Sequence, residues 1–364
     1  MGIAPINWCN DDMPELGSDI SLDQCLSEMQ EAGYSATELG HKFPTEADIL
    51  KPLLGNYKLA LASSWYSTYF VEKHNHAEQL AKLECKLKFL FEMGTHVINL
   101  AECSGTVHNK KNSPLSSRPT FDDAGWDRLV DGLNKVGKLC RRYGIRAAFH
   151  HHMGTGVQTA EEIDRLLSQT EMETVFLCAD TGHMQFSGFD PYPVFEKHMD
   201  RIAHIHLKDL RENVFKEMLS TDASFLNSIL EGIFTVPGDG MIDFTPIFNL
   251  INESGYKGWM IVEAEQDPSN FNPLHYDDTF GEFMVPGTGI IIHGALKGGW
   301  LGHFVTDWAG EEGFVRRLAC QYRGMDVPRR MNTQTETKDG ETWHCKGKVT
   351  KKYEENGQHL VDLE

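Results

Sequence analysis

The chain has 364 residues, which corresponds to one large domain or two smaller ones at about 150 residues per domain. Hydrophobic residues make up 40% of it and charged residues 24%, and no apolar run approaches the roughly 18 residues of a membrane span. Composition therefore excludes a membrane-spanning protein and a largely disordered one. The 34 Lys and Arg against 53 Asp and Glu give a net charge of −19, which repels phosphate and anionic lipid and argues against a nucleic-acid-binding protein.

The N-terminal residues and the cysteines point to the cytoplasm. Met1-Gly2-Ile3-Ala4-Pro5 lacks the basic start and apolar stretch of a signal peptide, so we expect a cytoplasmic protein. The eight cysteines are scattered without a CxxC pair, which is typical of reduced structural thiols.

Short β-rich runs alternate with helical patterns over the first three-quarters of the chain, which indicates repeated βα units. The predicted strands, in chain order, are Ile3–Trp8, Ser35–Leu39, Leu59–Ser64, Val97–Glu102, Ile145–His151, Val175–Asp180, Ile202–His206 and Trp259–Glu263. Their ends span the roughly 250 residues of a typical (β/α)8 barrel. The sequence therefore predicts an α/β fold of the TIM-barrel type.

The intervening segments carry helix start and stop signals. Ser21-Leu22-Asp23-Gln24 and Thr159-Ala160-Glu161-Glu162 are capping-box patterns that predict helix starts. Four glycines follow apolar periodic segments and precede predicted strands, namely Gly33, Gly94, Gly144 and Gly255. A left-handed residue commonly ends a helix at such a position.

The pattern changes near Gly281, so we place a boundary there, with a barrel over residues 1–280 and a short α+β tail over 285–364. Within the tail, Lys346–Lys352 and His359–Leu363 resemble two strands about an Asn356-Gly357 turn. Arg329–Lys338 is polar and aperiodic, which predicts a loop or a disordered insertion.

Polar residues end the predicted barrel strands, where the reacting groups of such barrels lie. They are Glu102, His150-His151-His152, Asp180 with His183, His204 and His206, and Glu263 with Glu265. Because side chains alternate along a strand, His150 and His152 share one face, as do Glu263 and Glu265. Carboxylates and imidazoles that converge from several strands suit Mn²⁺, Co²⁺ or Zn²⁺.

Each of these residues also has a purely structural interpretation. A histidine can be a hydrogen-bonded core residue, and Asp180-Thr181-Gly182-His183 can be an Asx turn that leaves a strand. Lys208 shares a face with His206 and could contact a substrate oxygen or form only a surface ion pair. Asn7 and Trp8 could line the pocket or make a polar turn.

Several segments resemble inosose dehydratases, which belong to the xylose-isomerase-like barrels. The resemblance covers roughly residues 1–275 and is carried by Ile3–Asp12 (IAPINWCNDD), Gly33–Gly40 (GYSATELG), Phe149–Thr155 (FHHHMGT), Ala179–His183 (ADTGH), Ala203–Asp209 (AHIHLKD) and Gly258–Pro268 (GWMIVEAEQDP). These barrels typically bind a divalent metal through Glu, Asp, His and a second Glu.

The resemblance implies a metal site in which Asp180, His206 and Glu263 match three of the four positions. His150 stands where many relatives have glutamate, so the resemblance leaves His152 as an alternative fourth ligand. Glu265 replaces Glu263 if the last strand is registered two residues later. The implied metal is Mn²⁺ or Co²⁺.

The same resemblance implies the dehydration of a cyclic polyol ketone, 2-keto-myo-inositol, to a trihydroxycyclohexane-dione. Removal of a proton beside the ketone and loss of hydroxide from the next carbon need a base and an acid. The candidates are His152, His183 and Glu265, with Lys208 as a further catalytic residue. Asn7, Trp8 and Glu102 are candidate substrate-binding residues. The alternatives are a ketose isomerase or epimerase on the same barrel, an inactive sugar-binding barrel, and an endonuclease, which the charge disfavours.

The tail from about Val285 resembles the second half of a MaoC-type hot-dog hydratase, over Ile291–Leu296 and Cys345–Glu364. The catalytic half of that domain is absent, so the resemblance implies a non-catalytic segment. A partial hot-dog leaves sheet edges open, which predicts association with another copy of the chain or disorder.

Overall fold

A computed structural model describes residues 1–72, 76–267, 301, 304–310, 315, 346–355 and 358–364. The chain divides into two compact units, 1–270 and 271–364. Each unit is described below by itself.

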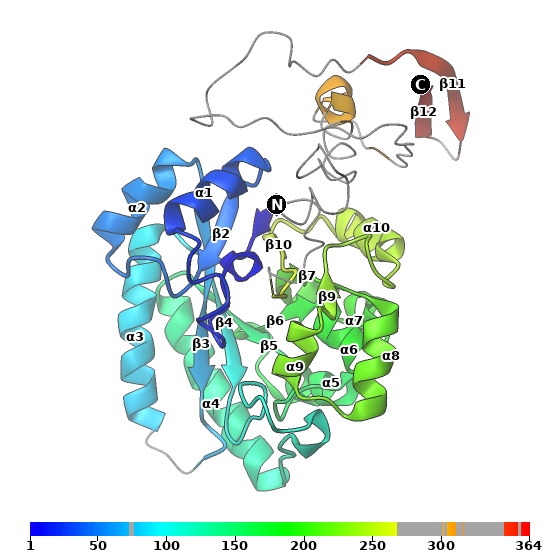
Figure 1. Cartoon of the computed structure of the whole chain (residues 1–364). Coiled ribbons are helices and arrows are strands. Elements are labelled where there is room, and N and C mark those ends of the chain that lie inside the picture. The colour runs from blue at the N-terminus through cyan, green and yellow to red at the C-terminus, as the bar shows by residue number, and fades with distance from the viewer. Residues whose placement is uncertain (73–75, 268–300, 302–303, 311–314, 316–345, 356–357) are drawn as a thin grey trace. The chain divides into compact units, whose positions relative to one another are not determined.

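The first unit is a closed parallel barrel, which confirms the predicted fold class (Figure 1). Its strands follow one another around the barrel in the order β1-β10-β7-β6-β5-β4-β3-β2. They are β1 (Gly2–Ile3), β2 (Ala36–Leu39), β3 (Ala60–Thr68), β4 (Val97–Glu102), β5 (Arg146–His150), β6 (Val175–Asp180), β7 (Ile202–Leu207) and β10 (Met260–Val262).

All of the predicted barrel strands form, but the first is much shorter than expected. Pairing of β1 ends at Ile3, and Pro5–Asn7 forms a single 3-10 turn in place of the predicted strand to Trp8. Proline has no backbone N–H and fixes its own φ angle, so Pro5 cannot donate a ladder hydrogen bond and starts the turn. The third strand is longer than predicted and continues to Thr68.

Helices surround the barrel and connect its strands (Figure 1). They are α1 (Leu22–Glu31), α2 (Ala47–Asn56), α3 (His76–Met93), α4 (Asp123–Arg142), α5 (Ala160–Gln169), α6 (Thr181–Phe186), α7 (Pro191–His198), α8 (Glu212–Thr221), α9 (Phe225–Leu230) and α10 (Phe244–Ser254). Their apolar faces pack on the strands in one continuous core. Burial of this kind, rather than helix propensity, supplies most helix stability in proteins.

The sequence signals at the helix ends act as predicted. Thr159 and Glu162 form a reciprocal capping box at α5, whereas Ser21 caps α1 through Gln24 N–H alone. The four glycines noted in the sequence have φ between +68° and +83°, as a left-handed helix end requires.

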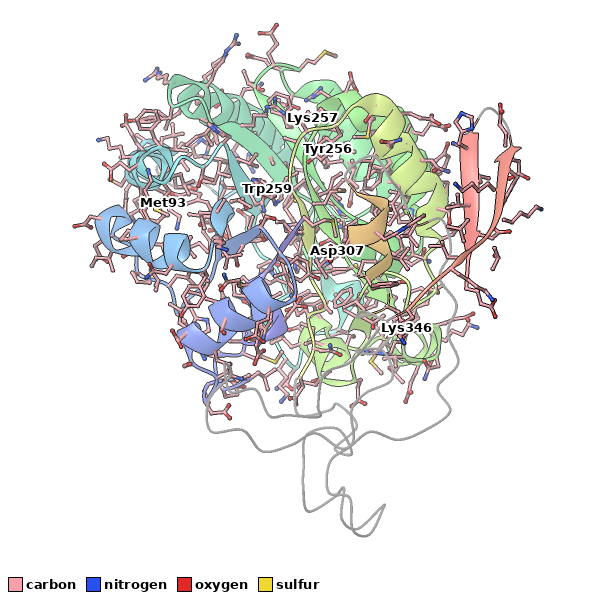
Figure 2. All side chains as sticks on the ribbon, turned by 90° about the horizontal axis from the view of Figure 1, so that it is seen from above. Met93, Tyr256, Lys257, Trp259, Asp307 and Lys346 are labelled. Carbon is pink, nitrogen blue, oxygen red and sulfur yellow. The ribbon has the colours of Figure 1, made fainter. Side chains whose placement is uncertain are left out.

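The strands of the barrel begin at one end of it, where the helices connect to them, and their carboxyl ends lie at the other. Figure 2 shows the first of these ends, with Met93 at the end of α3 and with Tyr256 and Trp259 in the segment from α10 to β10. The Tyr256 hydroxyl donates to the backbone oxygen of Trp259 at 3.1 Å. The functional candidates lie toward the opposite end.

An additional antiparallel pair follows the seventh barrel strand. β8 (Asp209–Leu210) pairs with β9 (Phe234–Thr235), and the Asp209 carboxylate accepts hydrogen bonds from the backbone N–H groups of Gly238, Gly240 and Ile242. These bonds fix the backbone directly after Lys208, a residue that faces the cavity described below.

In the second unit, β11 (Val349–Glu355) pairs antiparallel with β12 (Gln358–Leu363), as predicted. The predicted Asn356-Gly357 turn, the Arg329–Lys338 segment and the Ile291–Leu296 segment lie outside the described residues. Every helix in the described ranges is too short or too polar to cross a bilayer.

Candidate metal centre and active site

A cavity of about 610 Å³ opens at the carboxyl ends of the barrel strands. This volume lies within the range of small-molecule binding sites. The polar and aromatic side chains that line it include Asp12, Glu38, Trp65, Asn99, His108, His150, His152, His206, Lys208, Glu263 and Glu265. In TIM-barrel enzymes this end of the barrel holds the active site.

Four side chains from consecutive strands converge at the floor of this cavity. His150 ends β5, Asp180 ends β6, His206 lies in β7 and Glu263 follows β10. His150 Nε2 lies 3.3 Å from Asp180 Oδ2 and 3.1 Å from His206 Nδ1. His206 Nδ1 in turn lies 3.4 Å from Asp180 Oδ2 and 3.3 Å from Glu263 Oε2.

This arrangement fits a divalent cation. Ligand atoms bound at about 2.1 Å to one first-row metal lie roughly 3.0–3.4 Å apart, and the four separations above are 3.1–3.4 Å. Asp180 Oδ2 is fully buried and has no hydrogen-bond partner among the described residues. The other oxygen, Oδ1, accepts the backbone N–H of His183 at 2.9 Å, which fixes the carboxylate with Oδ2 toward the cluster.

The charges around the cluster are strongly coupled. Burial would lower the pKa of His206, but the neighbouring acidic groups, Glu263 and Glu38 among them, raise it well above its usual value. Burial would raise the pKa of Asp180, yet Lys208 and the surrounding imidazoles hold it well below its usual range. In the metal-free protein these neighbours therefore favour the charged form of each group.

Lys208 is the buried cation of the site. Its Nζ lies 2.9 Å from Glu263 Oε2, 3.5 Å from Asp180 Oδ2 and 3.6 Å from Glu265 Oε2. These carboxylates raise the pKa of Lys208 despite its burial. The ammonium group thus contacts two of the same oxygens that face His206.

Glu265 is a buried carboxyl group in the wall of the cavity. Its Oε1 accepts the side-chain N–H of Asn10 at 2.9 Å. Burial raises the pKa of Glu265 to about 7, although Lys208 partly offsets this effect. Near neutral pH the carboxyl therefore has accessible protonated and ionised forms, as a general acid or base needs.

The two histidine candidates for proton transfer occupy different places. His152 lines the cavity, whereas His183 lies behind it, with the two ring centroids 4.0 Å apart. His183 Nε2 lies 3.2 Å from Lys208 Nζ. Burial lowers the pKa of both rings well below the usual value, so both are neutral. Among the described residues, His152 belongs to none of the clusters of possible metal-ligand atoms, whereas His150 belongs to two of them, one with Cys178 and His206 and one with Asp180 and His183.

The three residues predicted to bind substrate do not line the cavity. Glu102 is buried and accepts hydrogen bonds from the backbone N–H of Phe70 and the hydroxyl of Thr68, both at 2.9 Å. Asn7 links the first and last strands through Val262 O and Ala264 N, and Trp8 donates to Glu28. The strand-end criterion cannot separate such structural contacts from a place in the cavity.

Several residues of the site were not singled out in the sequence. Glu38 lies in β2, with its Oε1 atom 3.3 Å from His206 Nε2, and its neighbours Ser63 and Asn99 come from β3 and β4. Glu38 is part of the GYSATELG segment and lies near the end of a predicted strand, so the strand-end criterion could have identified it. His108 and Asp12 lie in loops, where no periodic pattern marks them.

Comparison with known proteins identifies the class of this barrel. Residues 26–281 match the family model of the xylose isomerase-like TIM barrel. Among solved structures, the IOLI protein with a bound zinc atom superimposes with a TM-score of 0.55 and 15% identity, covering 74% of this chain and 90% of that one. A probable 3-DHS dehydratase from Bacillus anthracis, AsbF, gives a TM-score of 0.54 and 13% identity, over 74% of this chain and 94% of that one. The chain is thus a xylose isomerase-like barrel.

Closer relatives narrow the assignment. The inosose dehydratase of Geobacillus thermodenitrificans is 46% identical over 277 residues, which cover 76% of this chain and 93% of the relative. The inosose dehydratase of Clostridium beijerinckii is 42% identical over 290 residues, covering 79% and 97%. This chain belongs to the inosose dehydratase family.

Proposed function

We propose that the protein dehydrates 2-keto-myo-inositol to a trihydroxycyclohexane-1,2-dione and water, with a divalent cation, Mn²⁺ or Co²⁺, held by His150, Asp180, His206 and Glu263. The observation that carries the proposal is the convergence of these four ligand atoms at the floor of a cavity that Lys208 and Glu265 also line. The names and high coverage of the relatives supply the substrate class.

The elimination removes one C–H proton beside the ketone and one hydroxide from the next carbon, and the two leave as water. A bound divalent cation would polarise the ketone and make that C–H more acidic. Glu265 and His152 both line the cavity, so we assign the base and the acid to this pair. His183 lies behind them and holds Lys208 and the ring of His152 in place.

Lys208 would bind and orient the substrate. Lys208 lines the cavity, its stem lies against Gly182, and its Nζ lies over the ring of Phe234, 5.1 Å from the ring centroid. A fixed cation of this kind can donate to a hydroxyl or ketone oxygen of a polyol and hold it in one orientation.

The tail is assigned no part in this chemistry. We propose that it derives from the second half of a MaoC-type hot-dog domain, that it lacks catalytic activity, and that it mediates association between copies of the chain. The antiparallel β11–β12 pair supports the proposed association, because a two-stranded sheet has edges that another strand can extend.

The test is a product assay on metal-stripped protein with 2-keto-myo-inositol, before and after addition of Mn²⁺ or Co²⁺. We expect the wild-type protein to produce the ultraviolet absorbance of an enolised dione only when metal is added. We expect Asp180→Asn neither to bind metal stoichiometrically nor to form product. Asp164→Asn is the control, because among the described residues Asp164 pairs with Lys197 and His198 and with none of the four proposed ligands. Bound metal without dione would instead favour a ketose isomerase or epimerase.

A further inference from the structure

A buried carboxylate lies on the side of His206 that faces away from the ligand cluster. His206 Nδ1 faces Asp180 and Glu263, whereas Nε2 lies 3.3 Å from Glu38 Oε1. The imidazole therefore bridges Glu38 and the metal position. Glu38 comes from β2, which is separated from β7 by β10 and β1 around the barrel.

The position of the Glu38 carboxylate is fixed by several donors. Its Oε1 accepts hydrogen bonds from Ser63 Oγ at 2.5 Å, Asn99 Nδ2 at 3.0 Å and His204 Nε2 at 2.8 Å. These side chains come from β3, β4 and β7, which are rigid barrel strands. Because the donors approach from three strands, the carboxylate oxygen cannot move away from His206 without breaking them.

The hydrogen bonds also decide which nitrogen of His206 carries hydrogen. Asn99 Nδ2 lies 3.2 Å from His206 Nε2, but the amide has two hydrogens, and shorter contacts to Glu38 Oε1 and Ser63 Oγ use both. The neighbour left for Nε2 is the Glu38 carboxylate, which only accepts when ionised. Nε2 therefore carries hydrogen, and a neutral ring then has its lone pair on Nδ1, toward Asp180 and Glu263.

We propose that Glu38 is a positioning residue for the metal: it holds hydrogen on Nε2 of His206 and thereby presents Nδ1 to the divalent cation. This inference rests on the proposed metal site and deepens it, because it explains how the imidazole ligand is oriented. A carboxylate that accepts from a metal-bound imidazole fixes its tautomer and increases its basicity. Removal of such a partner typically weakens metal binding by about 10–100-fold.

The experiment titrates metal-stripped protein with Co²⁺ in competition with a chelator. Glu38→Gln keeps the shape of the side chain and removes its charge, and we expect it to weaken Co²⁺ binding by about 10–100-fold. The matched control is Glu102→Gln, since Glu102 is also a buried strand glutamate with several donors but contacts none of the four ligands. The control should bind Co²⁺ like the wild type.

A second readout reports the role of Glu38 without any variant. In Zn²⁺-loaded wild-type protein, ¹⁵N spectra of the histidine rings should show His206 with hydrogen on Nε2 and Nδ1 bound to the metal. Hydrogen on Nδ1, or unchanged Co²⁺ affinity in folded Glu38→Gln, would overturn the inference. Neither measurement uses the substrate, so metal binding without dione formation would refute the proposed reaction and leave this inference intact.

Discussion

Replacement of Lys208 by methionine tests whether the lysine and the metal compete for the same oxygens. In the metal-free protein the ammonium group lies 2.9–3.6 Å from Glu263, Asp180 and Glu265, all of them buried. Loss of one partner of such a buried pair typically costs about 3–5 kcal/mol, so metal-free Lys208→Met should be destabilised by about that amount. A bound cation restores positive charge at these oxygens. If it offsets only about 1.4 kcal/mol of the loss, linkage requires that the variant bind metal about tenfold more tightly.

The measurements are urea unfolding of the metal-free proteins and competitive titration with Zn²⁺ or Co²⁺. Lys42→Met is the matched control, because Lys42 Nζ donates to two backbone oxygens, at 2.6 Å from Gly17 O and 2.5 Å from Ile20 O, and pairs with no carboxylate among the described residues. The control should lose stability without a change in metal affinity. Unchanged or weaker metal binding by folded Lys208→Met would refute the idea that the two cations share their oxygens.

Three further substitutions, one of them with a matched control, probe the framework around the site. Glu102→Gln should lower the free energy of unfolding by about 1–3 kcal/mol in urea titrations, because it replaces one of the two oxygens that accept backbone N–H groups with an NH₂ donor. In Gly182→Ala the new Cβ would lie 2.4 Å from Lys208 Cβ, so the free energy of unfolding should fall by about 1–3 kcal/mol and turnover by about 100-fold. The control is Gly55→Ala, at a helix position with no atom within 4 Å of the new Cβ, and its free energy of unfolding should rise by about 0.5–1 kcal/mol. Equal thermal shifts for these two variants would contradict the packing argument. Thr159→Ala removes the capping box of α5 and should cost about 1 kcal/mol by thermal unfolding, with unchanged metal affinity.

The barrel could be predicted from the sequence because its signals are local. Each strand is a short β-rich run, and the helix ends carry their own caps, such as the Thr159–Glu162 box and the left-handed Gly255. The error at the first strand has a local cause as well. Pro5 ends the ladder and begins a turn, and the run Ile3–Trp8 is too short for periodicity to show this.

The sequence could predict only those residues of the site that lie at the ends of predicted strands. The ligand group follows from the positions of Asp180, His206 and Glu263 at neighbouring strand ends, which a closed barrel brings together. Which of His150 and His152 lies beside Asp180 and His206 could be seen only with coordinates, because His150 is the last residue of its strand and the chain leaves the strand before His152. Coordinates were also needed to see that Asn7, Trp8 and Glu102 make hydrogen bonds within the fold and do not line the cavity.

The glutamates Glu38 and Glu102 show why residue type and strand position do not determine a role. Both are buried, both lie in barrel strands and both accept several hydrogen bonds. Glu38 faces two imidazoles, so its charge acts on a proposed metal ligand, whereas Glu102 faces backbone N–H groups of the segment after β3, so its charge holds a loop. The hydrogen-bond partners of Glu38 are 25 to 168 residues away along the sequence, and most partners of Glu102 are 31 to 34 residues away. Contacts over such separations depend on strand register around the whole barrel, and no local pattern in the sequence specifies that register. The paired substitutions of these two residues therefore separate a metal-directed carboxylate from a structural one within the same fold.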